Sequence, residues 1–246
     1  MKKNYQATKD LLKDKVILIT GAGQGIGRVA AITYAAHGAT VILLGRNIEK
    51  LEAVYDEIET AGYAQPAIFS LDLEKATDAE YEALAQAIKL QLGRLDGILH
   101  NAVRFFSLCA IELQTLDQWN SMLRVNLIAP FALTRACLPL LKESPDASII
   151  MTSETHGHSP AAYWGGFAVS KNGVETLVKV WSQEFEMLPN LRINALIPGP
   201  VQTTQRAKTH PGELKETMPK PEDLMQTYLY LMGKDSREIS GQIVAC

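Results

Sequence analysis

KVILITGAGQGIGR, residues 15–28, is the stretch that decides the fold of this chain. It opens with the apolar run 16–19, which is rich in β-branched residues and short enough for a buried strand. Glycines follow at alternate positions, and from Ile26 the apolar residues recur at helical spacing. The free N–H groups of a first helical turn attract an anion. The stretch therefore predicts a strand, a glycine turn and a helix that together bind a dinucleotide pyrophosphate.

Strand-like and helix-like patterns alternate along the rest of the chain. Repeated units of this kind require a parallel sheet with helices on both faces. We predict a single α/β domain over residues 1–246, built on a doubly wound parallel sheet. The expected strands are 16–19, 39–44, 66–71, 95–100, 147–152, 191–197 and 242–244, and the expected helices begin at 26 and span about 47–61, 77–92, 116–141 and 166–188.

Composition excludes several function classes. A hydrophobic content of 47% and a net charge of −3 are ordinary for a globular protein, and no basic surplus favours nucleic acid. Residues 1–15 are polar and lack the apolar core of a secretory signal, and no apolar run reaches membrane-spanning length. Cys109, Cys137 and Cys246 are scattered and odd in number. We expect a cytoplasmic protein with reduced thiols, and neither a metal site, a nucleic-acid partner nor a membrane partner.

Residues 20–27 read Thr-Gly-x-x-x-Gly-Ile-Gly and resemble the motif of the short-chain dehydrogenase/reductase family, which binds NAD(H) or NADP(H) on a Rossmann fold. The likeness covers nearly the whole chain, and the segments 43–47, 100–102 and 228–232 resemble the YciK-like bacterial oxidoreductases of that family. Val103 departs from the pattern, since glycine is usual there. The resemblance implies cofactor contacts at Gly21, Gln24, Gly25, Ile26, Gly27, Asp72, Leu73, Asn101, Ala102, Lys171, Pro198, Gly199, Val201 and Thr203. For Asp72, a turn or helix-cap role is the alternative.

Arg46 bears on the choice of cofactor. A carboxylate about 20 residues past the glycine turn would bind the ribose 2′-hydroxyl of NAD(H). Gly45-Arg46-Asn47 offers none, and the guanidinium of Arg46 can pair with a 2′-phosphate. The sequence therefore favours NADP(H) over NAD(H), with a solvated surface arginine as the alternative.

The catalytic pattern of the family is broken. The family uses a tyrosine, a lysine four residues later and a serine about thirteen residues before the tyrosine. Here Lys171 is present, Phe167 takes the tyrosine position, and Glu154 stands at the serine position. Phe167 cannot donate a proton. The resemblance also implies that Asn126 holds a water linked to the lysine, with a satisfied core asparagine as the alternative.

Other groups are candidates for the missing proton chemistry. Tyr163 would lie one turn upstream of Phe167 if the helix extends that far. His156 and His158 fall in a loop near the expected pocket, where a solvated histidine is the alternative. Glu154 is expected to converge with the lysine as an ion pair, and its negative charge would then favour NADP⁺ over NADPH.

Two functions stay open at this point. The first is an NADP(H)-dependent oxidoreductase that acts on a carbonyl/alcohol pair of an unknown small-molecule substrate. The second is a catalytically impaired pseudoenzyme that binds NADP(H) for sensing or partner binding.

The family also implies a substrate lid around residues 200–219, where a solvated loop is the alternative and where Arg206, Lys208 and His210 suit an anionic substrate. It implies a homodimer or homotetramer that pairs through the helices 116–141 and 166–188. Trp181 and Phe185 would lie either in that interface or in the monomer core.

Overall fold

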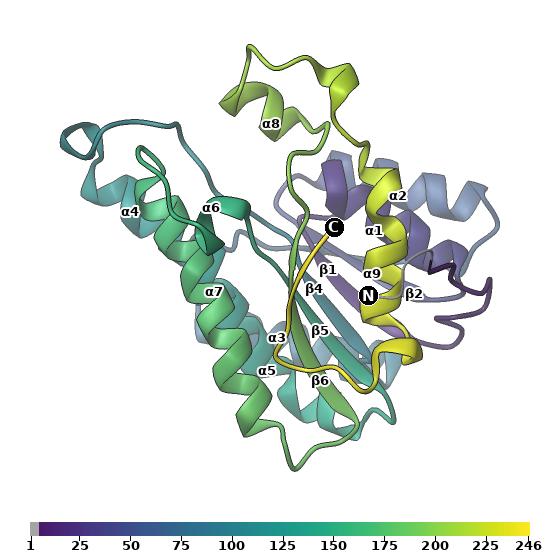
Figure 1. Cartoon of the computed structure of the whole chain (residues 1–246). Helices are drawn as coiled ribbons and strands as arrows, with labels where there is room; N and C mark the ends of the chain where they lie inside the picture. The colour runs from purple at the N-terminus through teal and green to yellow at the C-terminus, as the bar shows by residue number, and fades with distance from the viewer. Residues whose placement is uncertain (1–4) are drawn as a thin grey trace.

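The computed structural model describes residues 5–246 of the chain, apart from the side chain of Lys208. Seven strands form one sheet in the order β3-β2-β1-β4-β5-β6-β7, and every neighbouring pair is parallel (Figure 1). This is the predicted doubly wound Rossmann sheet, whose order reverses between β1 and β4. The strands are β1 Val16–Thr20, β2 Thr40–Gly45, β3 Ala67–Ser70, β4 Gly97–His100, β5 Ala147–Thr152, β6 Leu191–Ile197 and β7 Ile243–Ala245.

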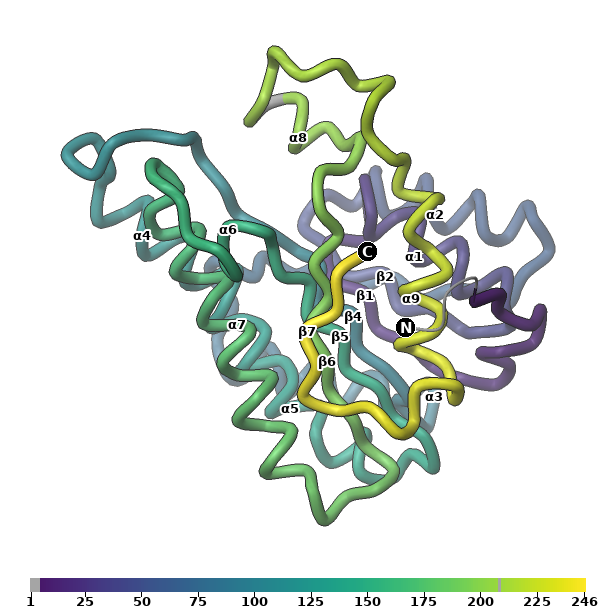
Figure 2. The backbone as a smooth tube through the Cα atoms, in the orientation of Figure 1, coloured from purple at the N-terminus to yellow at the C-terminus, as the bar shows by residue number. Residues whose placement is uncertain are grey.

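Helices cover both faces of the sheet. One layer holds α1, α2 and α9, and the other holds α3, α5 and α7 (Figure 1). The chain returns at its C-terminus to place β7 beside β6 (Figure 2). The helices are α1 Gly25–Ala36, α2 Ile48–Thr60, α3 Asp78–Leu92, α4 Leu116–Leu123, α5 Ala129–Glu143, α6 Thr155–His158, α7 Gly165–Glu184, α8 Thr204–Thr209 and α9 Met225–Met232. Helices α6, α8 and α9 were not predicted from the sequence pattern.

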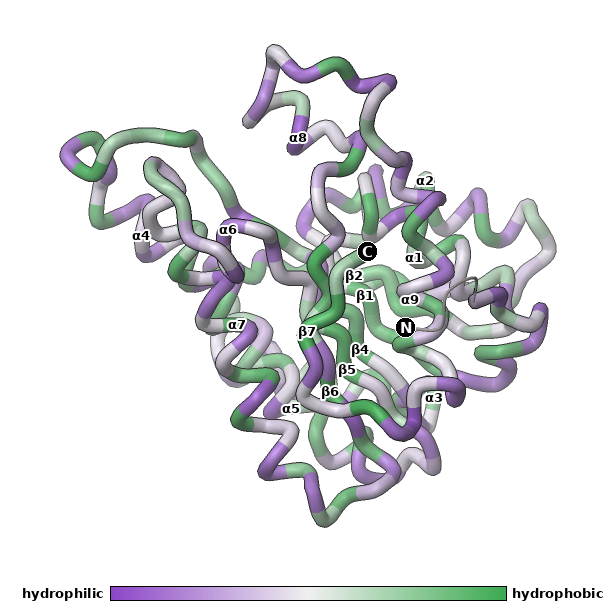
Figure 3. The backbone as a smooth tube through the Cα atoms, viewed as in Figure 1, coloured by the Kyte–Doolittle hydropathy of each residue, from purple (hydrophilic) through white to green (hydrophobic). Residues whose placement is uncertain are grey.

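The strands and helices form for the reasons that the sequence indicates. Every residue of β1, β5 and β6 is buried, as expected of central parallel strands, and these strands are drawn in the hydrophobic colour along much of their length (Figure 3). Asn47 caps α2 by accepting a hydrogen bond from the backbone N–H of Lys50. Thr77 and Glu80 form a capping box at the start of α3, and Gly93 ends that helix in the left-handed region with φ 73°.

The segment from α4 to α5 is one continuous helix, Leu116–Glu143, with a π-helical turn at Arg124–Ile128. By length and composition alone this helix is long and apolar enough to cross a membrane, although the sequence shows no unbroken apolar run of that length. However, 56% of its most apolar window is buried within the protein, where it packs against α3 and α7. It is therefore a core helix of the fold.

The start of α7, within one residue of the predicted one, decides the position of Tyr163. Tyr163 has φ 74°, in the left-handed region, so the helix begins only at Gly165. Tyr163 is consequently not in helical register with Phe167. The same helix ends at Glu184, short of the predicted end. Of the two places open to Trp181 and Phe185, the structure has them in the monomer core, where both are buried.

A buried ion-pair network lies at the amino ends of the central strands. Asp146, just before β5, accepts from Lys15 at 2.6 Å and from Arg192 at 2.7 Å, and Arg237 approaches at 3.1 Å. Burial alone would raise the pKa of Asp146, but the hydrogen bond from Lys15 and the charges of Arg192 and Lys15 lower it to about 2. This network holds β1, β5 and β6 together at the end of the sheet opposite the candidate site.

Candidate functional site

A cleft of about 450 Å³ opens at the carboxyl ends of the strands. It is lined by the residues that follow β1, β2, β3, β4, β5 and β6, as expected for a doubly wound sheet. The predicted site residues that line it are Gly21, Gln24, Gly25, Ile26, Arg46, Asp72, Leu73, Asn101, Ala102, Glu154, Phe167, Lys171, Pro198 and Thr203. The predicted residues that do not line it are Gly27, Asn126, Tyr163, Gly199 and Val201.

The glycine turn forms one wall of the cleft. Gly21 has φ 68°, and a Cβ there would lie 3.0 Å from the Cα of Ala102. A Cβ on Gly27 would lie 2.3 Å from the carbonyl oxygen of Gly21, so Gly27 permits close packing without facing the cleft. Thr20 Oγ1 accepts from the backbone N–H groups of Asn101 and Ala102, both at 3.0 Å, and so joins the ends of β1 and β4. The cradle leaves room at the N-terminus of α1 for a pyrophosphate.

Two cations lie at the end of the cleft beside α2. Arg46 follows β2, and Lys50 stands one turn into α2. Lys50 Nζ donates to Gln24 Oε1 at 2.6 Å, and a Cβ on Gly23 would lie 2.9 Å from the Cβ of Lys50. Lys50 was not among the residues predicted from the sequence, although its spacing of four residues from Arg46 is a signal that could have indicated it. Together these residues fit the 2′-phosphate end of NADP(H).

Asp72 lines the same end of the cleft but also has a local role. Its Oδ1 accepts from the backbone N–H of Glu74 at 3.1 Å, and its backbone carbonyl accepts from Lys75 and Ala76. This is the turn role that the sequence left open as the alternative. Leu73 beside it is buried and lines the cleft.

Lys171 reaches the cleft from α7. Its Nζ donates to the carbonyl oxygen of Thr152 at the end of β5, at 2.8 Å. Burial lowers the pKa of Lys171 to about 8, against the charge of Glu154, which raises it. The ring of Phe167 stands where a tyrosine would, with its centroid 5.9 Å from Nζ and 4.7 Å from the edge-on ring of Phe105. The site therefore keeps the lysine and replaces the phenol with a hydrocarbon ring.

Glu154 does not form the predicted ion pair. Its Oε2 accepts from the backbone N–H of His156 at 2.5 Å, and its Oε1 lies 3.2 Å from His156 Nδ1. In the described part of the chain, no salt bridge within 4.0 Å joins Glu154 to Lys171. The reason is local, because Glu154 is the N-cap of α6 and is turned toward the start of that short helix. Its charge acts on the lysine only across a longer distance.

Asn126 lies inside the π-helical turn and is satisfied by protein groups. Its Oδ1 accepts from the backbone N–H of Arg104 at 2.7 Å, and its Nδ2 donates to the carbonyl oxygen of Arg104 and to Ser170 Oγ. The structure thus gives Asn126 the satisfied-core role that the sequence analysis held as the alternative. It does not line the cleft.

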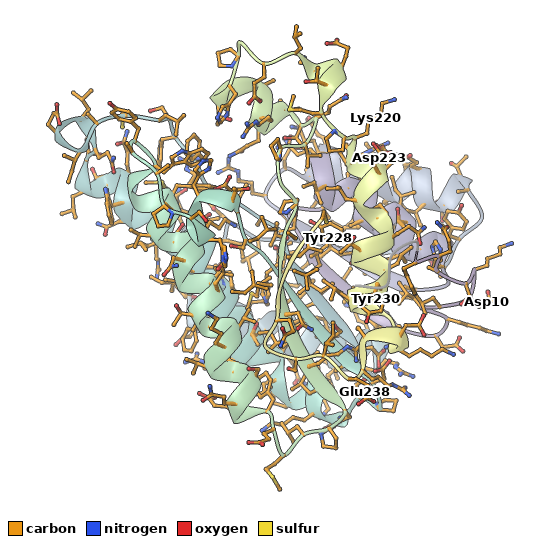
Figure 4. The ribbon with its side chains drawn as sticks, viewed as in Figure 1. Asp10, Lys220, Asp223, Tyr228, Tyr230 and Glu238 are labelled. Atoms are coloured by element: carbon orange, nitrogen blue, oxygen red, sulfur yellow. The ribbon has the colours of Figure 1, made fainter. Side chains whose placement is uncertain are left out.

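Neither of two nearby tyrosines replaces the missing one. Tyr163 is 62% exposed and lies outside the cleft lining. Tyr228 projects from α9 (Figure 4), is fully buried and has a hydroxyl without a partner among the described residues. Burial raises the pKa of Tyr228 well above its usual range, and because Tyr228 does not line the cleft, its hydroxyl cannot reach a substrate there.

The side chains of His156 and His158 both contact other protein groups and are not freely solvated. His158 Nδ1 lies 2.8 Å from Glu175, which also accepts from Ser153 Oγ at 2.6 Å. His156 stacks on the ring of Trp164 with centroids 4.0 Å apart. The two histidines therefore fix the loop around α6 against α7.

The expected lid stands above the carboxyl ends of the strands and carries α8 (Figure 1). Thr203 caps α8 by accepting from the backbone N–H of Arg206 at 3.1 Å. The guanidinium of Arg206 makes a two-point pair with Glu213, so it is already neutralised and not poised for an anionic substrate. The side chain of Lys208 lies outside the described residues, and Gly199 lines a separate pocket under the lid.

Among residues 5–246, no group of three or more His, Cys, Asp or Glu side chains is placed to hold a metal ion. The cleft is lined by four cationic side chains and three carboxylates, namely Arg46, Lys50, Arg104, Lys171, Asp72, Glu74 and Glu154. The chemistry that this arrangement supports is the binding of an anionic dinucleotide and of a substrate at its far end.

Comparison with known proteins agrees with this geometry. The family model described as short chain dehydrogenase matches residues 15–214. The uncharacterized oxidoreductase YciK of Escherichia coli K12 is 44% identical over 238 residues, which cover 97% of this chain and 94% of that protein. A short chain dehydrogenase structure from Pseudomonas syringae superposes with a TM-score of 0.96 at 45% identity and covers 98% of both chains. One from Escherichia coli CFT073, complexed with NADPH, has a TM-score of 0.94 at 43% identity and covers 97% of this chain and 99% of that one.

Proposed function

Because this chain belongs to the short-chain dehydrogenase family, we propose that it is an oxidoreductase that binds NADP(H) in the cleft and transfers hydride between that cofactor and a small organic substrate. The observation that carries the proposal is the pair of cations, Arg46 and Lys50, beside the glycine turn. No carboxylate follows β2 within the described lining of the cleft. The NADPH complex of the Escherichia coli CFT073 relative supports the same cofactor.

The preference for NADP(H) is tested at these two cations. We expect Arg46→Ala to weaken NADPH binding by about 1.5 kcal/mol, or roughly tenfold, because one charge-assisted contact to the 2′-phosphate is lost. Lys50→Ala should have a similar effect, and the affinity for NADH should change little in either variant. Fluorescence titration with both cofactors measures this. Tighter binding of NADH than NADPH by the unmodified protein would contradict the assignment.

The chain's own residues set the conditions at the reacting end. When bound, NADP(H) supplies or accepts the hydride. Lys171 holds a positive charge beside the cleft, Phe167 forms an apolar wall, and Glu154 places a carboxylate there. The family's carbonyl/alcohol reaction needs an acid at the tyrosine position, and Phe167 supplies none. We therefore propose that reduction of a carbonyl substrate is slow in the unmodified protein.

A second candidate function is an NADP(H)-binding protein without turnover, which the replacement of two proton-handling groups by Phe167 and Glu154 favours. The carboxylate of Glu154 would stabilise the positive ring of NADP⁺ relative to neutral NADPH. Two charges within one cleft interact by about 2 kcal/mol at an effective dielectric constant of about 20.

We expect the unmodified protein to bind NADP⁺ more tightly than NADPH, by roughly tenfold. In Glu154→Ser this difference should shrink, because the carboxylate that opposes the ring charge is gone. Calorimetric titration with both cofactor forms gives the ratio. Equal affinities in the unmodified protein would overturn the electrostatic argument.

We also propose a cytoplasmic homodimer or homotetramer that pairs through the helices 116–143 and 165–184. With Trp181 and Phe185 in the monomer core, the side chains that support this face are the exposed apolar ones on its two helices. These are Leu116, Ile128, Phe131, Val169 and Val180. Light scattering at micromolar concentration should give at least twice the monomer mass, and a monomer would contradict the proposal.

A further inference from the structure

The reacting end of the cleft lacks an evident proton donor for a carbonyl substrate. Among its described lining residues there is no tyrosine, and the ring of Phe167 stands at the family's acid position. Ser153 donates its hydroxyl proton to the buried carboxylate of Glu175. Lys171 is 4% exposed and donates to the carbonyl of Thr152. A substrate that needs a proton together with a hydride is therefore expected to react slowly in this cleft.

The same end does carry a partly exposed carboxylate. Glu154 lines the cleft, its side chain is 21% exposed, and both of its oxygens have protein contacts only to His156. A carboxylate accepts about four hydrogen bonds, so Glu154 retains acceptor capacity. The nearest lining cation, Lys171, makes no contact ion pair with it.

The other lining cations are committed elsewhere in the cleft. Arg104 contacts Glu74 at 3.8 Å and lies over the ring of Phe106 at 4.7 Å. Arg46 and Lys50 lie at the α2 end, beside the glycine turn. Glu154 thus presents a carboxylate in the part of the cleft lining that also includes the ring of Phe167, while the ammonium of Lys171 there is bonded to the carbonyl oxygen of Thr152. A carboxylate and an aromatic ring that line one cleft together attract an organic cation.

We propose that the substrate of this cleft is a cationic C=N compound, an iminium ion or its amine counterpart, whose positive charge lies against Glu154. This inference rests on the proposed hydride transfer and names its substrate class. A carbonyl that receives a hydride leaves negative charge on oxygen and requires a proton. An iminium carbon that receives the hydride of NADPH forms a C–H bond, while the C=N π pair becomes the nitrogen lone pair, so no proton is needed.

Charge conservation at the site supports this class. Before the reaction the substrate is positive and the dihydronicotinamide ring is neutral. Afterwards the amine is neutral as formed and the ring of NADP⁺ is positive. The cleft therefore holds one positive charge before the reaction, on the substrate, and one after it, on the ring of NADP⁺. The fixed carboxylate of Glu154 stabilises the positive charge in both states. The reduction of an iminium ion needs no acid at the position of Phe167, so the replacement of a tyrosine there does not slow it.

The binding test needs no turnover. Tetrahydroisoquinoline is a cation near neutral pH, and isochroman is its neutral oxygen isostere; pyrrolidine and tetrahydrofuran form a smaller matched pair. Calorimetry on the NADPH complex should show the cation of at least one pair binding about tenfold or more tightly than its ether. Glu154→Gln should abolish the difference, whereas Glu186→Gln, at an exposed site beyond α7, should preserve it. Equal affinity for cation and ether in both pairs would overturn the inference.

The turnover test separates the inference from the proposed function. The unmodified protein should oxidise NADPH with 3,4-dihydroisoquinoline at least about 100-fold faster than with the shape-matched ketone 1-tetralone. Faster reduction of the ketone, falling as pH rises past the pKa of Lys171, would identify that lysine as an acid and overturn the inference. A third outcome is that cations bind through Glu154 but neither compound is turned over. That result would reject the proposed hydride transfer and would still establish that the site prefers cations.

Discussion

The double variant Glu154→Ser with Phe167→Tyr is expected to reduce carbonyl substrates with NADPH about 10²- to 10⁴-fold faster than the unmodified protein. That range is the usual contribution of a positioned general acid. The new phenol would stand four residues before Lys171 on α7, so the two side chains share one helix face. The ammonium of Lys171 would lower the pKa of the phenol, and the new serine would donate to the substrate oxygen.

The single variants should gain less. Phe167→Tyr alone places the phenol beside the carboxylate of Glu154, which opposes ionisation of a neighbouring acid. Glu154→Ser alone removes that charge but supplies no acid. NADPH consumption, followed by absorbance over a panel of aldehydes and ketones, measures each variant.

Two controls define this prediction. Phe185→Tyr adds a phenol to another buried ring near the end of α7, away from the cleft, and should give no gain. Adding Lys171→Met to the double variant should remove most of the gain. A double variant that folds and binds NADPH normally, yet reduces no carbonyl faster, would show that more than these two replacements separates this cleft from its family.

Asp146→Asn is expected to lower the free energy of unfolding by about 3–5 kcal/mol, the usual cost of removing one partner from a buried ion pair. The side chains of Asp146 and Arg192 are only 7% and 4% exposed. Without the carboxylate, Lys15 and Arg192 would face each other as buried cations. Lys15 can lose its proton, since burial already lowers its pKa, but the guanidinium of Arg192 stays charged.

The stabilisation that Asp146 provides is expected to decrease at acidic pH. The pKa of Asp146 is lowered from 3.8 to about 2, so its stabilising contribution is complete above pH 3.8 and is lost as the pH falls through about 2. The stability difference between the unmodified protein and Asp146→Asn should therefore narrow over that window. Urea unfolding followed by circular dichroism at several pH values tests this.

The matched control is a surface pair. Arg28 and Glu57 are hydrogen-bonded, but their side chains are 40% and 43% exposed. Glu57→Gln should cost less than about 1 kcal/mol, as exposed ion pairs do. If Asp146→Asn costs no more than this control, the network at the amino ends of the strands does not stabilise the fold.

Much of the cofactor half of the site was predictable from the sequence. Apolar runs, glycines and caps act within a few residues, so they located the strands and helices, and a parallel sheet brings the carboxyl ends of its strands to one edge. The residues after each strand therefore meet without further information. Arg46 and Asn101 could be placed in one cleft on this ground alone.

The reacting end was not predictable in the same way. The sequence left open whether the helix predicted from 166 reaches back to Tyr163, and the left-handed backbone of that residue, φ 74°, keeps it out of the helix. The unpredicted helix α6 gave Glu154 a partner two residues away, in place of the expected Lys171. The spacing of apolar residues along the sequence could not have predicted either feature.

By itself, then, the sequence determined the doubly wound sheet, the glycine cradle and the absence of a phenol at Phe167, because these follow from local pattern and residue identity. Only the tertiary structure decided which charges meet. It paired Asp146 with Lys15 and Arg192 across distant strands, and it placed the carboxylate of Glu154 against His156 instead of Lys171. The physical reason is that a charge interacts according to distance and burial, and both are set by how remote segments pack.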